Sequence, residues 1–177
     1  MRLLISIIIV VGLIIFLRLS YARKSVRTGL LAVYVIAVLA ITLGTRKVND
    51  VTHVIFDPFV VYERTIKSVL QGWRTGGWAE AWKHLGWYKG QLSSIGLNVL
   101  LFVPLGHLVP SIMMRFDRWW KVLLLGFMSS LLIETVQLIT KLGWFDASDL
   151  LHNTLGALMG YWIYCKWSGA RKRPRRT

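Results

Sequence analysis

The chain has 177 residues, of which 55% are hydrophobic, and its 22 Lys and Arg against 8 Asp and Glu give a formal net charge of +14. The length favours a single domain. The basic residues fall in clusters between and after apolar runs, as in the loops of a membrane protein, so we expect no nucleic-acid partner. A single cysteine, Cys165, excludes a disulfide within the chain.

Five apolar runs follow one another along the chain, at residues 3–17, 28–43, 95–113, 122–139 and 150–165. Helices are expected, because an open strand would leave backbone groups unpaired in lipid. The first two runs are short for a span of about 20 residues, and their flanks extend them. Pro104 removes a backbone donor from the third and predicts a kink. The runs predict an all-α, polytopic membrane helical bundle of about five transmembrane helices.

The first run has a second interpretation. Ser20-Tyr21-Ala22 follows it and is similar to a signal-peptide cleavage site. Only Arg2 precedes the run, and Arg18 interrupts it before that site. An uncleaved span is therefore the expectation.

Residues 44–94 form the one long segment outside the membrane. Asp57-Pro58 is typical of a helix start, and apolar residues then recur at roughly helical spacing. Trp78 and Trp82 share a face if the following glycine-broken stretch is helical. We expect a Trp-rich amphipathic segment of one or two short helices on the outer membrane surface. The alternative is a loop that folds back on the bundle as a lid.

Counts of Lys and Arg orient the chain. Four basic residues follow the first run, three lie between the third and fourth runs, and six occupy the tail. With five spans these clusters share one side, so the N-terminus is expected outside and the C-terminus in the cytoplasm. The expected division is two N-terminal transmembrane helices (1–43), an extracellular amphipathic loop (44–94), a three-helix core (95–165) and a basic cytoplasmic tail (166–177).

Six polar side chains lie in or against the last three runs: Asn98, Glu134, Gln137, Asp146, Asp149 and Asn153. An unpaired polar group in hydrocarbon costs several kcal/mol, so these groups need partners inside the bundle or at its mouth. With five spans all six reach the same leaflet. Intramembrane ionisable residues indicate a functional site, and we predict an outward-facing ligand-binding site here.

Each of these residues also has a structural explanation. Asp149 alone is compatible with a helix cap, and Asn98, Gln137 and Asn153 with hydrogen bonds between helices. Glu134 is harder to explain without a cation, a donor network or a bound ligand. His152 is expected at a helix interface rather than as a ligand.

The carboxylates of Glu134, Asp146 and Asp149 would suit a hard cation such as Mg²⁺ or Ca²⁺. The sequence has no zinc spacing, phosphate loop or dinucleotide motif, and no cofactor is expected. Gly156 and Gly160 form a small-xxx-small pair that predicts close helix packing.

Three stretches follow one another in the last three runs: residues 98–106 (NVLLFVPLG), residues 134–137 (ETVQ), and residues 145–149 with 153–157 (FDASD and NTLGA). In this order and spacing they resemble signatures of the VanZ-like family of bacterial membrane proteins. Together they cover the core at 95–165. Family members usually carry an Arg shortly before the Phe-Asp pair, where this chain has Gly143 and Trp144, with Lys141 as the nearest substitute. The resemblance implies an integral membrane protein, some relatives of which contribute to resistance to glycopeptide antibiotics such as teicoplanin.

Three functions remain open. The first is binding of an envelope lipid, a lipid-linked cell-wall precursor or a lipophilic glycopeptide antibiotic at the outer polar residues. The second is an intramembrane enzyme in which Glu134 acts as acid or base and a divalent cation assists. The third is a non-catalytic scaffold whose polar residues join helices. Membrane lipids are the expected partners in every case, and the sequence does not define an oligomeric state.

Overall fold

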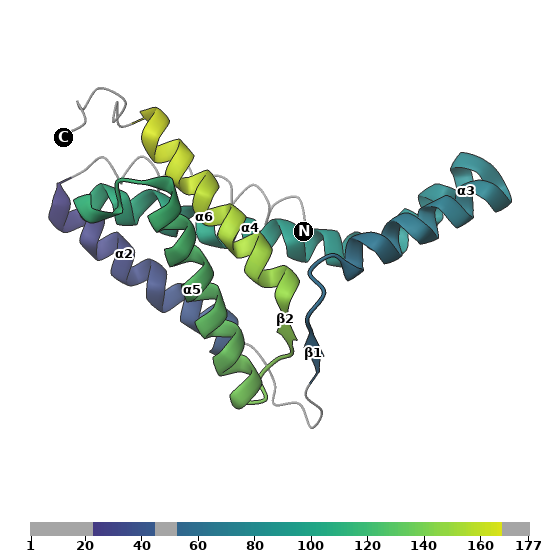
Figure 1. Ribbon diagram of the computed structural model, residues 1–177, viewed down its shortest axis with the longest axis horizontal. Helices are drawn as coiled ribbons and strands as arrows, with labels where there is room; N and C mark the ends of the chain where they lie inside the picture. The colour runs from purple at the N-terminus through teal and green to yellow at the C-terminus, as the bar shows by residue number, and fades with distance from the viewer. Residues whose placement is uncertain (1–22, 45–52, 168–177) are drawn as a thin grey trace.

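The computed structural model describes residues 23–44 and 53–167 of the chain. The helices are α2 (Lys24–Leu39), α3 (Val60–Trp87), α4 (Lys89–Ile112), α5 (Trp119–Ile139) and α6 (Ala147–Trp167) (Figure 1). A π-helical turn, η1 (Ala40–Gly44), extends α2, and a 3-10 turn, η2 (Met114–Phe116), precedes α5. In the described ranges the strands are β1 (Val54–Ile55) and β2 (Phe145–Asp146), which pair in parallel. The predicted all-α fold is confirmed.

Three stretches are long and apolar enough to cross a membrane: Lys24–Gly44, Lys89–Ile112 and Trp119–Ile139. They contain the second and fourth predicted runs and all of the third but its last residue, and α6 contains the fifth. The helix of the third run, α4, begins at Lys89 rather than at residue 95, and it stays helical through Pro104 and Pro110. The first run, the possible cleavage site and most of the basic tail lie outside the described residues.

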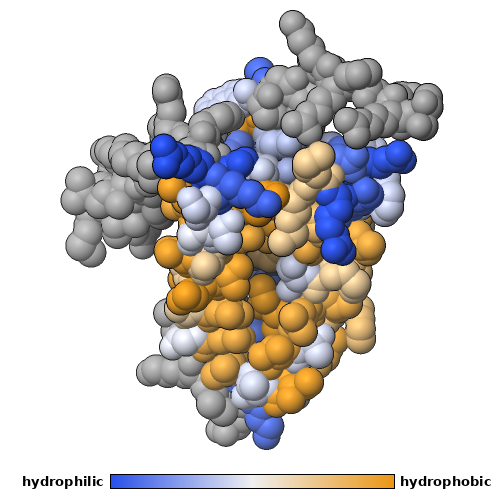
Figure 2. Space-filling model, turned by 90° about the vertical axis from the view of Figure 1, so that its left-hand side faces the viewer, coloured by the Kyte–Doolittle hydropathy of each residue, from blue (hydrophilic) through white to orange (hydrophobic). Residues whose placement is uncertain are grey.

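α2, α4, α5 and α6 alternate in direction, so the connections between them lie at two opposite ends of the bundle. Arg27 at the start of α2 donates to the backbone oxygen of Ser111 at the end of α4. Tyr161 of α6 donates to the backbone oxygen of Asp117, before α5, at 2.6 Å. The described members of the three basic clusters lie at this end, and we call it the basic end. The opposite end, where α5 leads into β2 and α6 begins, is the β2 end. One face of the molecule is mainly apolar, with hydrophilic residues gathered towards its upper edge (Figure 2).

Glycines set the close approach of α4 and α6, the two helices that pack most extensively. A Cβ atom at Gly106 would lie 1.8 Å from the backbone oxygen of Ala157, and one at Gly160 would lie 2.0 Å from that of Val103. A Cβ at Gly156 would lie 2.1 Å from the backbone oxygen of Val99. Real Cβ atoms do not approach so closely, so only glycine fits, and the close packing predicted from Gly156 and Gly160 is confirmed.

Helix α3 is a helical hairpin that runs away from the bundle, and we call it the arm (Figure 1). Its two limbs, residues 60–75 and 78–87, meet at Gly76 and Gly77, which have non-helical backbone angles. Gly77 has φ of 66°, a left-handed conformation that glycine adopts without strain. The segment thus forms helices, as the sequence predicts, and it does not fold over the bundle as a lid.

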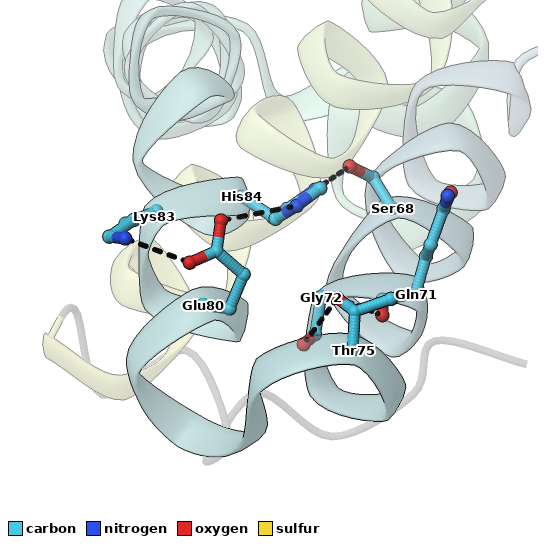
Figure 3. Close-up of polar contacts among 7 residues, drawn as sticks. All are labelled: Ser68, Gln71, Gly72, Thr75, Glu80, Lys83 and His84. Carbon is cyan, nitrogen blue, oxygen red and sulfur yellow. Dashed lines mark hydrogen bonds and ion pairs between the residues drawn. The ribbon is translucent and has the colours of Figure 1, made fainter.

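The two limbs of the arm pack through small and polar residues (Figure 3). A Cβ at Gly72 would lie 2.7 Å from the His84 ring and 3.1 Å from the backbone of Ala81, so the limbs touch at this point. One turn earlier, the Ser68 hydroxyl and His84 Nδ1 share a hydrogen bond of 2.8 Å. These contacts join the two limbs and leave most of the large apolar side chains outside the interface.

Candidate functional site

The six predicted site residues all lie towards the β2 end, on α4, α5, β2 and α6, and we call them the polar cluster. On α5 the buried residues form one stripe at the three- and four-residue spacing of one helix face: Val122, Gly126, Ser130, Glu134 and Gln137. The stripe begins with the nonpolar Val122 and Gly126 and is polar towards the β2 end. It faces α6, since the Gly126 position lies against Ala157.

Glu134 is the buried carboxylate of the cluster. It is 2% exposed, in a helix of span length. Its Oε2 accepts a hydrogen bond of 3.0 Å from the backbone N–H of Asp146. A buried carboxylate requires hydrogen-bond donors, and this bond supplies one. It also joins α5 to β2, the strand that leads into α6.

The two aspartates have different roles. Asp146 Oδ1 accepts from the backbone N–H of Ser148 at 2.8 Å and so caps the start of α6. Asp149 lies in the first turn of α6 and accepts from the Asn98 amide nitrogen at 2.5 Å, which joins α6 to α4. The capping hydrogen bond considered for Asp149 is therefore made by Asp146. Asp149 still gains from its place in the first turn, where a negative charge is favourable.

The two amides join further helices. Asn153 donates to the hydroxyl of Ser130 on α5 at 2.9 Å, and Gln137 donates to the backbone oxygen of Thr42 at 2.9 Å. Thr42 lies in the π-helical turn η1 at the end of α2, where backbone oxygens have no partner further along the helix and can accept from another one. In the part of the chain that the structure describes, the other amide atoms, Gln137 Oε1 and Asn153 Oδ1, are buried and have no hydrogen-bond partner.

The root of the arm is attached beside the cluster. The Tyr62 hydroxyl and His152 Nε2 share a short hydrogen bond, and β1 pairs with β2 in the register Val54–Phe145 and Ile55–Asp146. His152 is 2% exposed, as expected for a residue at a helix interface.

Sequence reasoning missed three partners: Ser130, Thr42 and Tyr62. Each is an uncharged residue in or beside an apolar run, and each bonds to a residue at least 20 positions away. The one available signal was spacing, because Ser130 lies four residues before Glu134 and so shares its helix face.

The carboxylates do not form the metal site that their number suggested. Among the described residues, no group of three or more His, Cys, Asp or Glu is placed to hold a metal ion. The hydrogen bonds explain this, because Asp146 turns to its own helix start, while Asp149 turns to Asn98. The arrangement instead offers hydrogen-bond acceptors between helices, at one end of a membrane bundle.

Comparisons with known proteins support one assignment. Neither the comparison with curated proteins nor the comparison with solved structures gave a match. The sequence profile of the VanZ/LLP1 family matches residues 3–168, nearly the whole chain and well beyond the three stretches that carried the resemblance. Together with the apolar helices, this match shows that the chain is a membrane protein of the VanZ/LLP1 family.

Proposed function

We propose that the polar cluster is an outward-facing binding site in a multi-pass membrane protein. Its ligand would be an envelope lipid, a lipid-linked cell-wall precursor or a lipophilic glycopeptide antibiotic, and the last case would give the protein a role in antibiotic resistance. The proposed orientation has the N-terminus outside and the C-terminus in the cytoplasm. The observation that carries the proposal is the burial of Glu134 in a helix of span length.

Burial of this carboxylate favours a binding function because an ionisable group is expensive inside a bilayer. A purely structural hydrogen bond between helices requires only an amide or a hydroxyl, as in the Asn153–Ser130 pair. The cluster also holds more acceptors than the described part of the protein satisfies, because Gln137 Oε1 and Asn153 Oδ1 are buried without a donor. Each such group costs about 1–3 kcal/mol. A ligand that donates hydrogen bonds would recover this free energy if the β2 end opened to admit it.

Two alternatives remain. The scaffold hypothesis is favoured by the pairs Asn98–Asp149 and Asn153–Ser130, each of which joins two helices. The enzyme hypothesis retains Glu134 as acid or base, but the described carboxylates give a divalent cation no common set of ligands. The behaviour of Glu134 distinguishes the proposal from the scaffold.

The test is the substitution Glu134→Gln, which keeps the shape of the side chain and its ability to accept from Asp146. The purified protein would be analysed by native mass spectrometry for retained lipids and lipid-linked precursors. We expect the variant to fold normally and to lose at least about tenfold in ligand retention, equivalent to about 1.4 kcal/mol.

Thr135→Val is the matched control, because the Thr135 hydroxyl bonds within its own helix, to the backbone oxygen of Leu131 at 2.7 Å. This variant should retain the ligand. Equal retention by wild type and Glu134→Gln would reject a role for the charge and leave the scaffold hypothesis.

A further inference from the structure

We propose that the arm is a membrane-docking element whose apolar face lies on the lipid leaflet at the β2 end, with its basic residues among anionic head groups. This inference goes beyond the proposed function and does not depend on what the polar cluster binds. It rests on an exposed apolar surface, on the charges beside it, and on the level at which the arm leaves the bundle.

The first limb presents an apolar stripe to the exterior. Ile66, Leu70 and Trp73 are 58%, 50% and 44% exposed, and their four- and three-residue spacing places them on one face of the helix. On the second limb Trp78 and Trp82 are 71% and 66% exposed, again one turn apart. The Trp73 and Trp78 rings touch, with centroids 4.4 Å apart, so the two stripes join into one surface across the hairpin.

Apart from the Trp73–Trp78 contact beside the turn, this surface does not hold the hairpin together. The limbs pack where Gly72 meets Ala81 and where Ser68 bonds to His84, and Gly72 and Ser68 lie on a different side of the first limb from the apolar stripe. The bundle does not cover it either, since within the described ranges the arm has only sparse contacts with the neighbouring helix α4. An uncovered patch of large apolar side chains marks an interaction surface.

The neighbouring face of the first limb is charged. Glu63, Lys67 and Arg74 follow one another at helical spacing, and Lys67 bonds to Glu63 at 3.0 Å. On the second limb Lys83 bonds to Glu80 at 2.8 Å, and this hydrogen bond lowers the pKa of Glu80, so that the pair stays ionised. The arm contains four basic and two acidic residues. Apolar and basic faces side by side are typical of helices that lie in the plane of a membrane surface.

The root of the arm sets its level relative to the membrane. β1 pairs with β2, and Tyr62 bonds to His152, so the arm leaves the bundle where α5 ends and α6 begins. Helices of span length end at the level of the lipid head groups. From this root the arm runs sideways, across the direction of α5 (Figure 1). At this level an apolar face can lie against the lipid leaflet, and tryptophan is the residue that favours this boundary.

The test uses the full-length protein in nanodiscs, with spin labels at single cysteines in a Cys165→Ala background. Ile66→Cys and Trp78→Cys report the apolar face, and Lys67→Cys is the matched control, one residue away with a 76% exposed side chain. Each label is exposed in turn to oxygen, which partitions into lipid, and to a water-soluble nickel chelate. We expect oxygen to relax the labels at residues 66 and 78 more than nickel does, and the reverse at residue 67. Replacing phosphatidylcholine by the anionic phosphatidylglycerol should move the labels at residues 66 and 78 deeper into the lipid, because the basic residues of the arm attract anionic head groups.

Leu70→Cys and Trp82→Cys form a second pair on the same face, in case a variant of the first pair does not fold. Nickel accessibility at the apolar positions equal to that at residue 67 would overturn the proposal and place the arm in water. Immobilised labels with dipolar coupling between protein copies would also overturn it, because the face would then be covered by a second copy.

Discussion

Asp149 and Asn98 show how a single side-chain pair can join two helices of this bundle. Their hydrogen bond of 2.5 Å connects the first turn of α6 to α4, and its acceptor is an ionisable group. Hydrogen bonds to charged groups contribute more than neutral ones, whereas bonds between membrane helices are worth less than expected, because unfolded helices in a bilayer also find partners. The pair should therefore be coupled, but only moderately.

A double-mutant cycle tests this coupling. We expect Asn98→Ala and Asp149→Ala each to destabilise the protein, and the double variant to lose about 1–2 kcal/mol less than the sum of the single variants. The measurement is equilibrium unfolding in mixed micelles. Asn98→Ala combined with Ser130→Ala should be additive, because Ser130 bonds to Asn153. Additivity in the first cycle would show that the pair contributes nothing to the fold.

The sequence predicted that the six residues of the polar cluster lie towards one end of the bundle, but it did not predict most of their partners. Spacing identifies neighbours on one helix only. In the structure Asp149 bonds to Asn98 on α4, and Asn153 bonds to Ser130 on α5. Contacts between helices depend on how the helices pack, and sequence spacing does not contain that information.

Glycines determine how closely the elements approach. A Cβ at Gly156 would lie 2.1 Å from the backbone oxygen of Val99. A backbone atom cannot move aside alone, so the two helices would have to separate to make room. By contrast, Gly96 on α4 is exposed and has open space where its Cβ would be. Replacement by alanine can therefore be compared at a crowded position, Gly156, and at an open one, Gly96.

Gly156→Ala should destabilise the protein by at least about 2 kcal/mol, because the added methyl group forces α4 and α6 apart. Gly96→Ala should change stability by less than about 1 kcal/mol, in the stabilising direction, since alanine favours the helix. Thermal unfolding of both variants in the same detergent gives the comparison. Similar midpoints would mean that the helices are less tightly packed at Gly156 than the structure indicates.

Helix positions were predictable at the scale of elements, and helix lengths less so. Apolar runs locate the lipid-facing centre of a helix, but α4 starts at Lys89 because a polar turn continues it outside the apolar run. The glycine-rich part of the arm predicted interruptions, and only Gly76 and Gly77 break the helix. Gly72 stays helical and instead lets the limbs touch. Glycine composition alone does not distinguish a break from a close contact.

For the whole molecule, the structure brings together segments that sequence reasoning grouped by charge. The start of α2, the connection from α4 to α5 and the second half of α6 meet at the basic end, through the Arg27–Ser111 and Tyr161–Asp117 hydrogen bonds. The pairing of β1 with β2 was not predicted, because two residues in a strand leave no periodic signal. It is nevertheless this pairing that attaches the arm to the end opposite the basic clusters.

This separation of ends allows the proposed orientation to be tested. The positive-inside rule predicts that the basic end is cytoplasmic, and the arm and the polar cluster are then expected to face outward. Met114, 75% exposed in the α4–α5 connection, and Gln71, exposed on the arm, are suitable labelling positions that leave every basic residue in place. In a Cys165→Ala background, a membrane-impermeant maleimide added to intact cells should label Gln71→Cys but not Met114→Cys. Permeabilised cells should show both. The opposite pattern in intact cells would reverse the orientation and place the polar cluster at the cytoplasmic leaflet, where it would not meet extracellular antibiotics or cell-wall precursors at the outer surface.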